Sequence, residues 1–285
     1  MKNLDKIYKA IENNSFGVYV GAGLSVGAGL PTWEQLLTDL IDKVERETTI
    51  SEDRIVELKQ LVQDPTKYLL IAEELRESLS DDLNVYIKEK FDDRKIKPTV
   101  AHELVVKLPS KFLITTNYDT LLEKAFIKTH SEEFPHVLTY EDASTINYNL
   151  WNDEYFILKA HGDAKTAPRN IVLTEKDYRK IIYQTYGYQS VMHTIFSSCS
   201  ILFIGASLSD PELLLLLSFI HNIFHGGSPH HYALMDSRKV TKLEIDRWRK
   251  DYNIHIIEYD SKDNHKEVND ILNEIISEKG SLTFD

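Results

Sequence analysis

The sequence contains a single cysteine, Cys199, among 285 residues. One cysteine cannot form an internal disulfide, and it cannot supply the four thiolates of a zinc ribbon. Cys199 lies in the apolar approach to an expected strand, where a small buried residue is a simpler interpretation than a reactive nucleophile. We therefore expect neither a disulfide framework nor a zinc ribbon, and we assign no residue to a metal.

Basic residues are also scarce relative to acidic ones. The chain has 33 lysines and arginines against 45 aspartates and glutamates, which gives a net charge of -12 and a pI of about 5.4. A nucleic-acid phosphate backbone would be repelled by this charge unless a local basic patch outweighed it. We therefore expect no direct binding to nucleic acid.

Long hydrophobic runs are absent as well. The most apolar stretch, residues 213–224, is interrupted by Ser218, His221 and Asn222 and is too short to span a bilayer. Residues 1–15 are charged and lack the apolar core of a signal peptide. These absences predict a cytoplasmic protein with no membrane segment.

Short apolar runs recur along the chain and set the expected fold. Between the first and second runs the pattern is helical, which predicts a helical insertion at about residues 42–108. The later runs alternate with helical or loop segments, as in a parallel sheet covered by helices. We predict a single α/β domain over residues 1–285, a Rossmann-like doubly wound parallel sheet of about six strands without a zinc ribbon. The six expected strands are at residues 16–20, 112–115, 155–160, 201–204, 231–235 and 254–259.

A glycine turn follows the first expected strand. It reads Gly21-Ala22-Gly23-Leu24-Ser25, continues to Gly29-Leu30-Pro31-Thr32-Trp33, and leads into an amphipathic helical pattern. Glycines let a backbone approach a pyrophosphate, and the following helix start stabilises its charge. The generic dinucleotide fingerprint has a third glycine where this chain has Val26. The alternative is a tight turn that uses glycine for its dihedral freedom.

Polar residues follow three further expected strands. These blocks are Thr116-Asn117-Tyr118-Asp119, His161-Gly162-Asp163 and residues 205–211, which include Gly205, Ser207 and Asp210. Each alone could be a turn or a helix cap. Ligands of doubly wound sheets bind at the carboxyl ends of the strands, so all four blocks should meet on one rim. Together they supply the amides, hydroxyls and titratable base that a dinucleotide needs.

Taken in order, the four blocks resemble the sirtuin fold. They span residues 18–211, and they are most similar to the sirtuin-like NADase domains of bacterial anti-phage defence systems, which typically carry Thr-Thr-Asn-Tyr-Asp and His-Gly-Asp. True deacetylases have a zinc ribbon, Asp-Phe-Arg where this chain has Thr32-Trp33-Glu34, and Gln where it has Thr116. These departures concern the acyl-lysine groove more than NAD+ cleavage.

The resemblance implies an NAD+ glycohydrolase that releases nicotinamide and ADP-ribose, with NAD+ as substrate and no zinc. Asn117 would position the ribose or the attacking water, and His161 would be the base, a role that suits a neutral imidazole. Asp119 would contact the nicotinamide amide and Trp33 would wall its pocket. The remaining predicted NAD+-binding residues, which include those holding the phosphates and the adenosine ribose, are Gly21, Ala22, Gly23, Ser25, Pro31, Gly205 and Ser207.

The resemblance also implies depletion of NAD+ in an infected cell, so the enzyme must be restrained when idle. We expect control by self-assembly into a homo-oligomer or by a separate sensor, with a translocase-type, HerA-like ATPase favoured over an argonaute-like or other protein. Two alternatives stay open. One is a protein deacylase or ADP-ribosyltransferase, and the other is a non-catalytic module that binds NAD+ or a nucleotide.

Four histidines near residue 226 also attract attention. A metal site among them is a weaker interpretation than a helix end, because a Gly-Gly-Ser-Pro loop separates the two pairs. The four are His221, His225, His230 and His231.

Overall fold

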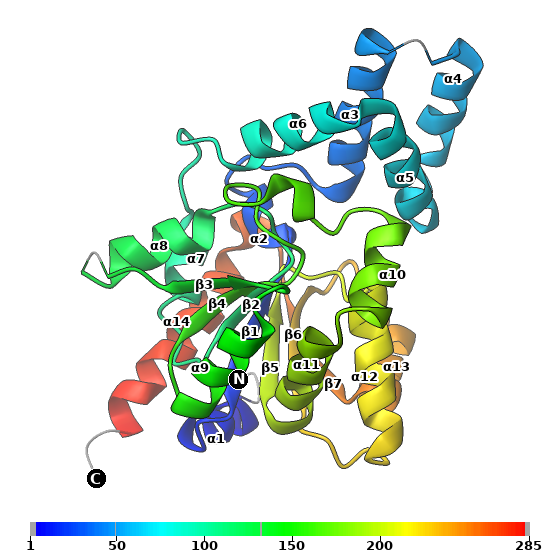
Figure 1. Ribbon diagram of the computed structural model, residues 1–285. Helices are drawn as coiled ribbons and strands as arrows, with labels where there is room; N and C mark the ends of the chain where they lie inside the picture. Colours follow the sequence, from blue (N-terminus) through cyan, green and yellow to red (C-terminus); the bar gives the residue numbers. More distant parts are fainter. Residues whose placement is uncertain (1–3, 49, 132, 283–285) are drawn as a thin grey trace.

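A seven-stranded sheet forms the centre of the computed structural model, which describes residues 4–48, 50–131 and 133–282 (Figure 1). The strand order is β3-β4-β2-β1-β5-β6-β7, and every neighbouring pair is parallel. The strands are β1 Phe16–Val20, β2 Leu113–Thr115, β3 His136–Thr139, β4 Phe156–Lys159, β5 Ser200–Ile204, β6 His231–Asp236 and β7 Ile254–Tyr259.

The predicted doubly wound parallel sheet is confirmed, with one strand more than the six expected. The additional strand is β3, at the edge of the sheet, and two of its four residues are exposed. An edge strand that is only partly buried lacks the continuous apolar run that reveals a central parallel strand. The sequence pattern therefore missed it.

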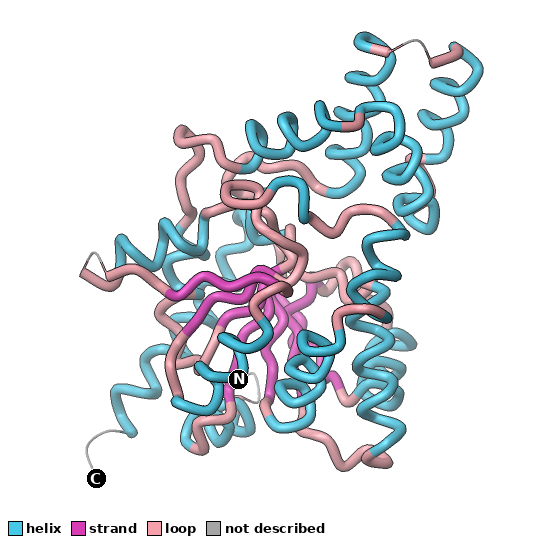
Figure 2. Tube along the Cα trace, in the orientation of Figure 1, coloured by secondary structure: helices cyan, strands magenta, loops and turns pink. Residues whose placement is uncertain are grey.

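Helices cover both faces of the sheet (Figure 2). One face packs against α9 Ala143–Asn152, α10 Glu175–Tyr183, α11 Tyr186–Ser198 and α12 Pro211–Ile223, in a core that includes Phe112, Phe156 and Phe203. The other packs against α1 Asp5–Glu12, α7 Val100–Val105, α8 Leu121–Thr129 and α14 Lys262–Leu282. The helix α13 Lys242–Tyr252 lies against β7. None of the described helices is long and apolar enough to cross a membrane.

Four helices between β1 and β2 share a separate core. They are α3 Trp33–Glu47, α4 Glu52–Leu61, α5 Tyr68–Leu79 and α6 Asp81–Phe91, joined in part by the short 3-10 helix Pro65–Lys67. The first begins at Trp33, ahead of the expected boundary near residue 42, because Thr32 and Gln35 form a capping box. Leu104 and Val105 of α7 belong to the sheet core instead.

This helical module lies over the carboxyl ends of the strands (Figure 1). Tyr118 and Leu121, which follow β2, are buried in the module's core, as are Ala164, Ile171 and Leu173, which follow β4. The chain reverses direction across the sheet between β1 and β5, the switch point at which doubly wound sheets bind ligands. The rim that carries the predicted site is therefore enclosed between sheet and module.

Candidate active site at the carboxyl ends of the strands

The loops after β1 and β5 touch through glycine. The Gly21 N–H donates to the Ile204 carbonyl at 3.0 Å, and the Gly23 N–H donates to the Gly205 carbonyl at 2.9 Å. A Cβ on Gly21 or Gly23 would lie 2.6 or 2.7 Å from the Gly205 oxygen, and Gly205 itself has a φ of +64°. The close approach that these glycines permit is therefore between two loops, and the N–H groups of Gly21 and Gly23 are already used there.

A buried hydrogen-bond network lies directly beneath these loops. The Ser25 hydroxyl, at the start of the short helix α2 Gly23–Val26, donates to Asp119 Oδ2 at 2.9 Å. Asn117 Nδ2 donates to Ser25 Oγ at 3.1 Å and to the Gly21 carbonyl at 3.2 Å. The second oxygen of Asp119 accepts the Leu121 N–H at 2.9 Å. The structure thus brings three of the predicted residues, Ser25, Asn117 and Asp119, into direct contact.

This network fixes which end of the Asn117 amide is free. A carboxylate only accepts hydrogen bonds, so the Ser25 hydroxyl uses its one proton to donate to Asp119. The atom of Asn117 that faces both Ser25 Oγ and the Gly21 carbonyl must then be the donor nitrogen. Asn117 Oδ1 is left buried with no hydrogen-bond partner. A buried acceptor without a partner is costly, which makes this oxygen a candidate contact for a bound ligand.

His102, on α7, completes the network. Its Nδ1 accepts the Thr99 N–H at 3.2 Å, and its Nε2 lies 3.4 Å from Ser25 Oγ, at the long end of a hydrogen bond. The ring is completely buried. Burial lowers the pKa of His102 to about 4, and the nearby Asp119 carboxylate only partly offsets this. His102 is therefore neutral at physiological pH.

His161, directly after β4 and Ala160, has charged surroundings. Its Nε2 lies 3.6 Å from Asp210 Oδ2 and 3.6 Å from Glu212 Oε2, which are ion-pair distances rather than hydrogen bonds. Burial alone lowers the pKa of His161, but the carboxylates of Asp210, Glu212 and the more distant Asp177 outweigh it and raise the pKa above its ordinary value. The resting imidazole therefore favours its protonated form more than a free histidine does.

The two carboxylates are themselves held by hydrogen bonds. Asp210 caps α12 by accepting the Leu213 N–H at 3.0 Å, and it accepts the Tyr178 hydroxyl at 2.6 Å. Glu212 Oε1 accepts Gln189 Nε2 at 2.8 Å. The donor atoms of His161, Asp210 and Glu212 lie within 4.8 Å of one another, close enough for a metal ion. The raised pKa of His161 favours a proton on the imidazole, which would offset the carboxylate charge, so the cluster does not need a metal ion to balance it.

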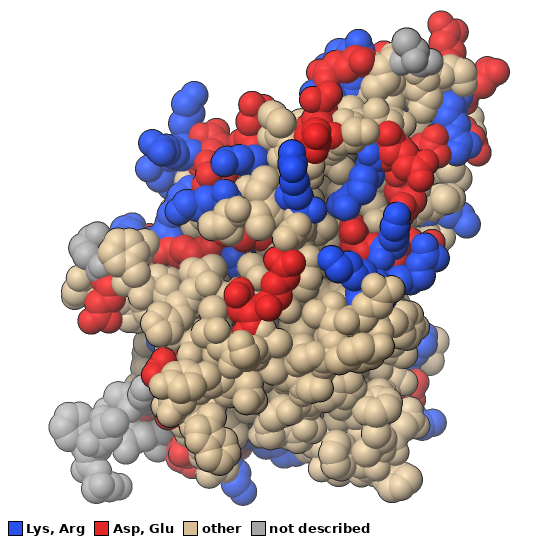
Figure 3. Space-filling view, in the orientation of Figure 1, with Lys and Arg blue, Asp and Glu red and all other residues tan. Residues whose placement is uncertain are grey.

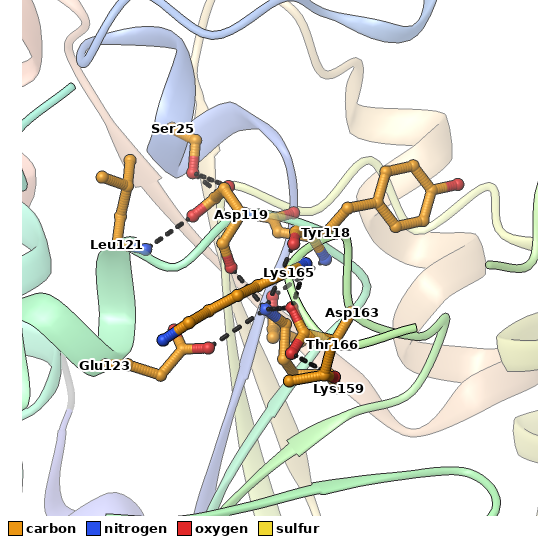
Figure 4. Close-up of polar contacts among 11 residues, drawn as sticks. Ser25, Tyr118, Asp119, Leu121, Glu123, Lys159, Asp163, Lys165 and Thr166 are labelled. Atoms are coloured by element: carbon orange, nitrogen blue, oxygen red, sulfur yellow. Dashed lines mark hydrogen bonds and ion pairs between the residues drawn. The ribbon is translucent and has the colours of Figure 1, made fainter. Parts of the chain in front are cut away.

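Lys159 connects the loops that carry Asn117 and His161 (Figure 4). Its fully buried ammonium donates to the carbonyls of Tyr118 and Asp119 at 3.1 and 2.6 Å. It also pairs with Asp163 at 2.9 Å and with Glu123 at 3.0 Å. One side chain thus holds the backbone beside Asn117 and Asp119 to the residue that follows His161-Gly162.

The remaining predicted residues lie apart from this network. Trp33 stacks on Tyr68 of the helical module, with ring centroids 6.2 Å apart and planes at 3°. Pro31 precedes the Thr32 cap of α3. Ser207 is exposed and its hydroxyl lies 2.7 Å from that of Ser209. Ala22 precedes α2 and is half-buried.

Four residues that the sequence analysis did not assign to the site contact it: His102, Lys159, Asp210 and Glu212. Asp210 belongs to one of the predicted strand-end blocks. The sequence Ser-Asp-Pro is also typical of a helix start, and Asp210 does cap α12, so its second contact with His161 was not predicted. Lys159 is the last residue of the buried strand β4, and a buried charge needs a partner. This was the one feature of the sequence that could have indicated its ion pairs. His102 gave no local signal of a place in the site, because Ser25, which its Nε2 faces, is distant in sequence, and its local contact with Thr99 is explained by helix capping.

The site is closed. Exposed fractions are 8% for Asn117, 5% for Asp119 and 3% for His161. The segment after His161 folds back over the rim: the Val172 N–H donates to the His161 carbonyl at 2.9 Å, and the Tyr118 hydroxyl donates to the Val172 carbonyl at 2.6 Å. Two surface hollows, one beside Tyr140 and Ile181 and one beside Val106 and Tyr155, are lined by other residues.

Comparison with known proteins identifies the family. The SIR2-like domain family matches residues 111–257, just over half of the 285 residues. The chain belongs to the SIR2-like family. The resemblance expected from the four sequence blocks is thereby confirmed.

Curated SIR2-like relatives include proteins named NAD(+) hydrolase ThsA. The one from Acinetobacter baumannii (strain 532279) is 29% identical over 252 residues, covering 85% of this chain and 46% of that protein. The one from Bacillus cereus (strain MSX-D12) is 26% identical, covering 84% and 47%. Defense-associated sirtuin 2 of Bacillus subtilis is 24% identical, covering 77% and 20%. The chain thus spans about half the length, or less, of these relatives.

Solved sirtuin structures share the fold of this SIR2-like chain. A Sir2 variant in complex with a deacetylated p53 peptide and 3'-O-acetyl ADP-ribose superposes with a TM-score of 0.51. The two chains are 13% identical, and the match covers 98% of this chain and 99% of the other. At this identity the likeness concerns the fold alone.

Proposed function

We propose that this chain is an NAD+ glycohydrolase that cleaves NAD+ to nicotinamide and ADP-ribose. The observation that carries the proposal is the buried, unpartnered carbonyl oxygen of Asn117, fixed in direction by Ser25 and Gly21. The names of the NAD(+) hydrolase relatives support it. A fixed acceptor oxygen can orient a water or a ribose hydroxyl without competing for its proton.

The reaction breaks the bond between the ribose and nicotinamide, and water supplies the new oxygen. Nicotinamide leaves with the bonding electron pair, positive charge develops on the ribose, and the attacking water loses one proton. His161 in its neutral form accepts that proton directly or through a ribose hydroxyl. The anionic surroundings of Asp119, Asp210 and Glu212 stabilise the positive charge that develops on the sugar. Asp119 also contacts the nicotinamide amide, and Trp33 borders the nicotinamide after the site opens.

In the cell, this activity would serve anti-phage defence by depleting NAD+. The burial of Asn117, Asp119 and His161 supports an enzyme that is restrained at rest and activated by a rearrangement. We propose that a separate sensor of the translocase-type ATPase class triggers it, and that the chain acts as a cytoplasmic homo-oligomer without binding nucleic acid or membrane.

An uncharged face supports the oligomer. The space-filling view has few charged side chains over its lower front, where α9, α11 and α12 lie (Figures 1 and 3). Leu215, Phe219 and Ile223 form a stripe on α12 and are about half exposed. Contiguous apolar surface of this kind is typical of protein interfaces.

The direct test is product analysis. The purified chain is incubated with NAD+, with and without a candidate ATPase partner, and nicotinamide and ADP-ribose are separated by chromatography. Asn117→Ala and His161→Ala should each reduce the rate by about 100- to 10,000-fold. The exposed Arg247→Ala on α13 is the matched surface control.

Two outcomes would redirect the interpretation. If both site variants retained full activity, the proposed catalytic residues would be wrong. If NAD+ bound but no product formed in any combination, the chain would be a nucleotide-binding module, and release of acetyl groups from a peptide would indicate a deacylase instead.

A further inference from the structure

His102 occupies a position for which the proposed reaction has so far given no reason. It is fully buried, it lies on α7 rather than at a strand end, and its ring faces the Ser25 hydroxyl in the centre of the site. A leucine-sized apolar group would fill the same volume at this point without bringing a polar group into the core. The polar atoms of the ring therefore call for a function.

The backbone determines which ring nitrogen carries the proton. A backbone N–H can only donate, so the Thr99 N–H at 3.2 Å makes Nδ1 an acceptor. The Thr99 hydroxyl, 2.8 Å from the same nitrogen, can donate to it as well. A neutral imidazole has one N–H, which must then be on Nε2, and Nε2 faces Ser25 Oγ.

The Nε2–H group in turn determines what Ser25 can do. It offers a donor to Ser25 Oγ, and Asn117 Nδ2 offers another. Because His102 and Asn117 both point donors at Ser25 Oγ, the Ser25 proton can only turn toward Asp119 Oδ2, which lies 2.9 Å away and accepts it (Figure 4). Each hydrogen bond thus enforces the direction of the next, from Thr99 through His102 to Ser25 and Asp119.

We propose that His102 is a positioning residue: as the neutral Nε2–H tautomer it locks the Ser25 hydroxyl onto Asp119, so that Asn117 must present its carbonyl oxygen to the substrate. The proposal rests on the proposed NAD+ cleavage. Without the Nε2–H donor, the Ser25 proton can turn away from Asp119 toward Asn117, and the Gly21 carbonyl then holds the Asn117 amide without the help of Ser25, so the amide is fixed less firmly. A misdirected amide would orient water or ribose wrongly and slow the chemical step more than it weakens NAD+ binding.

Two substitutions of His102 separate positioning from packing. His102→Leu removes both polar atoms, whereas His102→Gln keeps a donor near the position of Nε2. His231→Leu is the matched control, since His231 is equally buried but accepts from the Ile201 N–H in the sheet core. We expect His102→Leu to lower kcat by about 10- to 100-fold with little change in KM. His102→Gln should recover most of that loss, and His231→Leu should leave kcat near that of wild type once thermal stability is matched.

The tautomer provides a readout that does not depend on activity. Nitrogen-15 NMR of the full chain should show His102 at neutral pH with its proton on Nε2. A proton on Nδ1, or equal kcat values for His102→Leu and His231→Leu, would overturn the positioning role alone. If wild type cleaved no NAD+ with any partner, the proposed function would fail and the positioning role with it, so the two failures are distinguishable.

Discussion

The two halves of the candidate site are held in different ways. Around Asn117, the orientation of side chains is fixed by hydrogen bonds that meet at Ser25 and include a neutral histidine, whereas His161 lies 3.6 Å from two carboxylates without a short hydrogen bond to its Nε2. Burial lowers the pKa of His102 to about 4, while carboxylates raise the pKa of His161 despite burial. One half of the site therefore fixes the orientation of its side chains, and the other half provides a titratable group whose pKa is set by neighbouring charges.

The largest effect should follow from introducing charge into the neutral half. Asn117→Asp keeps the shape but replaces the donor Nδ2 with an oxygen facing Ser25 and the Gly21 carbonyl, beside Asp119. Two carboxylates and a carbonyl would then meet in a buried space. We expect NAD+ cleavage to fall by about 1,000-fold, no better than Asn117→Ala. Rates by product chromatography would check this, and an active Asn117→Asp would show that the amide donor is dispensable.

The next effect concerns the residue that joins the two halves. Lys159→Met removes the partner of the buried Asp163 carboxylate, of the partly buried Glu123 carboxylate and of two backbone carbonyls. Loss of one member of a buried ion pair costs about 3–5 kcal/mol, which urea unfolding can measure. Lys128→Met, which breaks an exposed pair with Glu103, is the control and should cost less than about 1 kcal/mol. If the two variants lost the same free energy of unfolding, Lys159 would not hold the loops together.

A smaller effect should appear in stability against pH. Burial lowers the pKa of His102 to about 4 and that of His231 to about 3, so the unfolded chain binds more protons than the folded one below about pH 6.5. The free energy of unfolding should therefore fall on acidification, by about 1.4 kcal/mol per pH unit for each histidine. His161, whose pKa is raised, contributes with the opposite sign, and it does so above about pH 6.5, where its stabilisation is lost as pH rises through the raised pKa.

Urea unfolding of wild type at pH 7 and pH 5 measures the effect. In His231→Leu, the free energy of unfolding should change less with pH than in wild type, by the contribution of one histidine. An unchanged slope would mean that His231 is not held neutral.

The sequence predicted the elements that produce a continuous local pattern of residues. Apolar runs located β1, β2, β4, β5, β6 and β7, and the carboxyl ends of four of them carried the polar blocks. The edge strand β3 escaped because it is only partly buried. The helical pattern expected from Trp33 is the helix α3, which begins there after the Thr32 and Gln35 capping box, whereas the boundary of the insertion was placed later, near residue 42.

Within the site, the sequence indicated residue types but not their partners. Ser25, Asn117 and Asp119 were named separately, and their mutual hydrogen bonds arise only when β1 and β2 pair. Asp210 and Glu212 were hidden because a carboxylate at a helix start is explained by capping alone. The glycines were interpreted as a phosphate cradle, whereas the Gly21 and Gly23 amides donate to the end of β5 and to the loop after it, contacts that depend on the β1–β5 pairing.

The most direct test of the contrast between the two halves is the initial rate of NAD+ cleavage against pH for wild type, Glu212→Gln and Ser25→Ala. Because His161 works as a neutral base, the wild-type rate should rise with pH through its raised pKa. Removing the Glu212 charge lowers that pKa, so the acid limb of Glu212→Gln should move to lower pH. Ser25→Ala should lower the rate at every pH without moving the limb. A limb that stays in place in Glu212→Gln, or that moves in Ser25→Ala, would contradict the division of the site into a geometric half and a charge-tuned half.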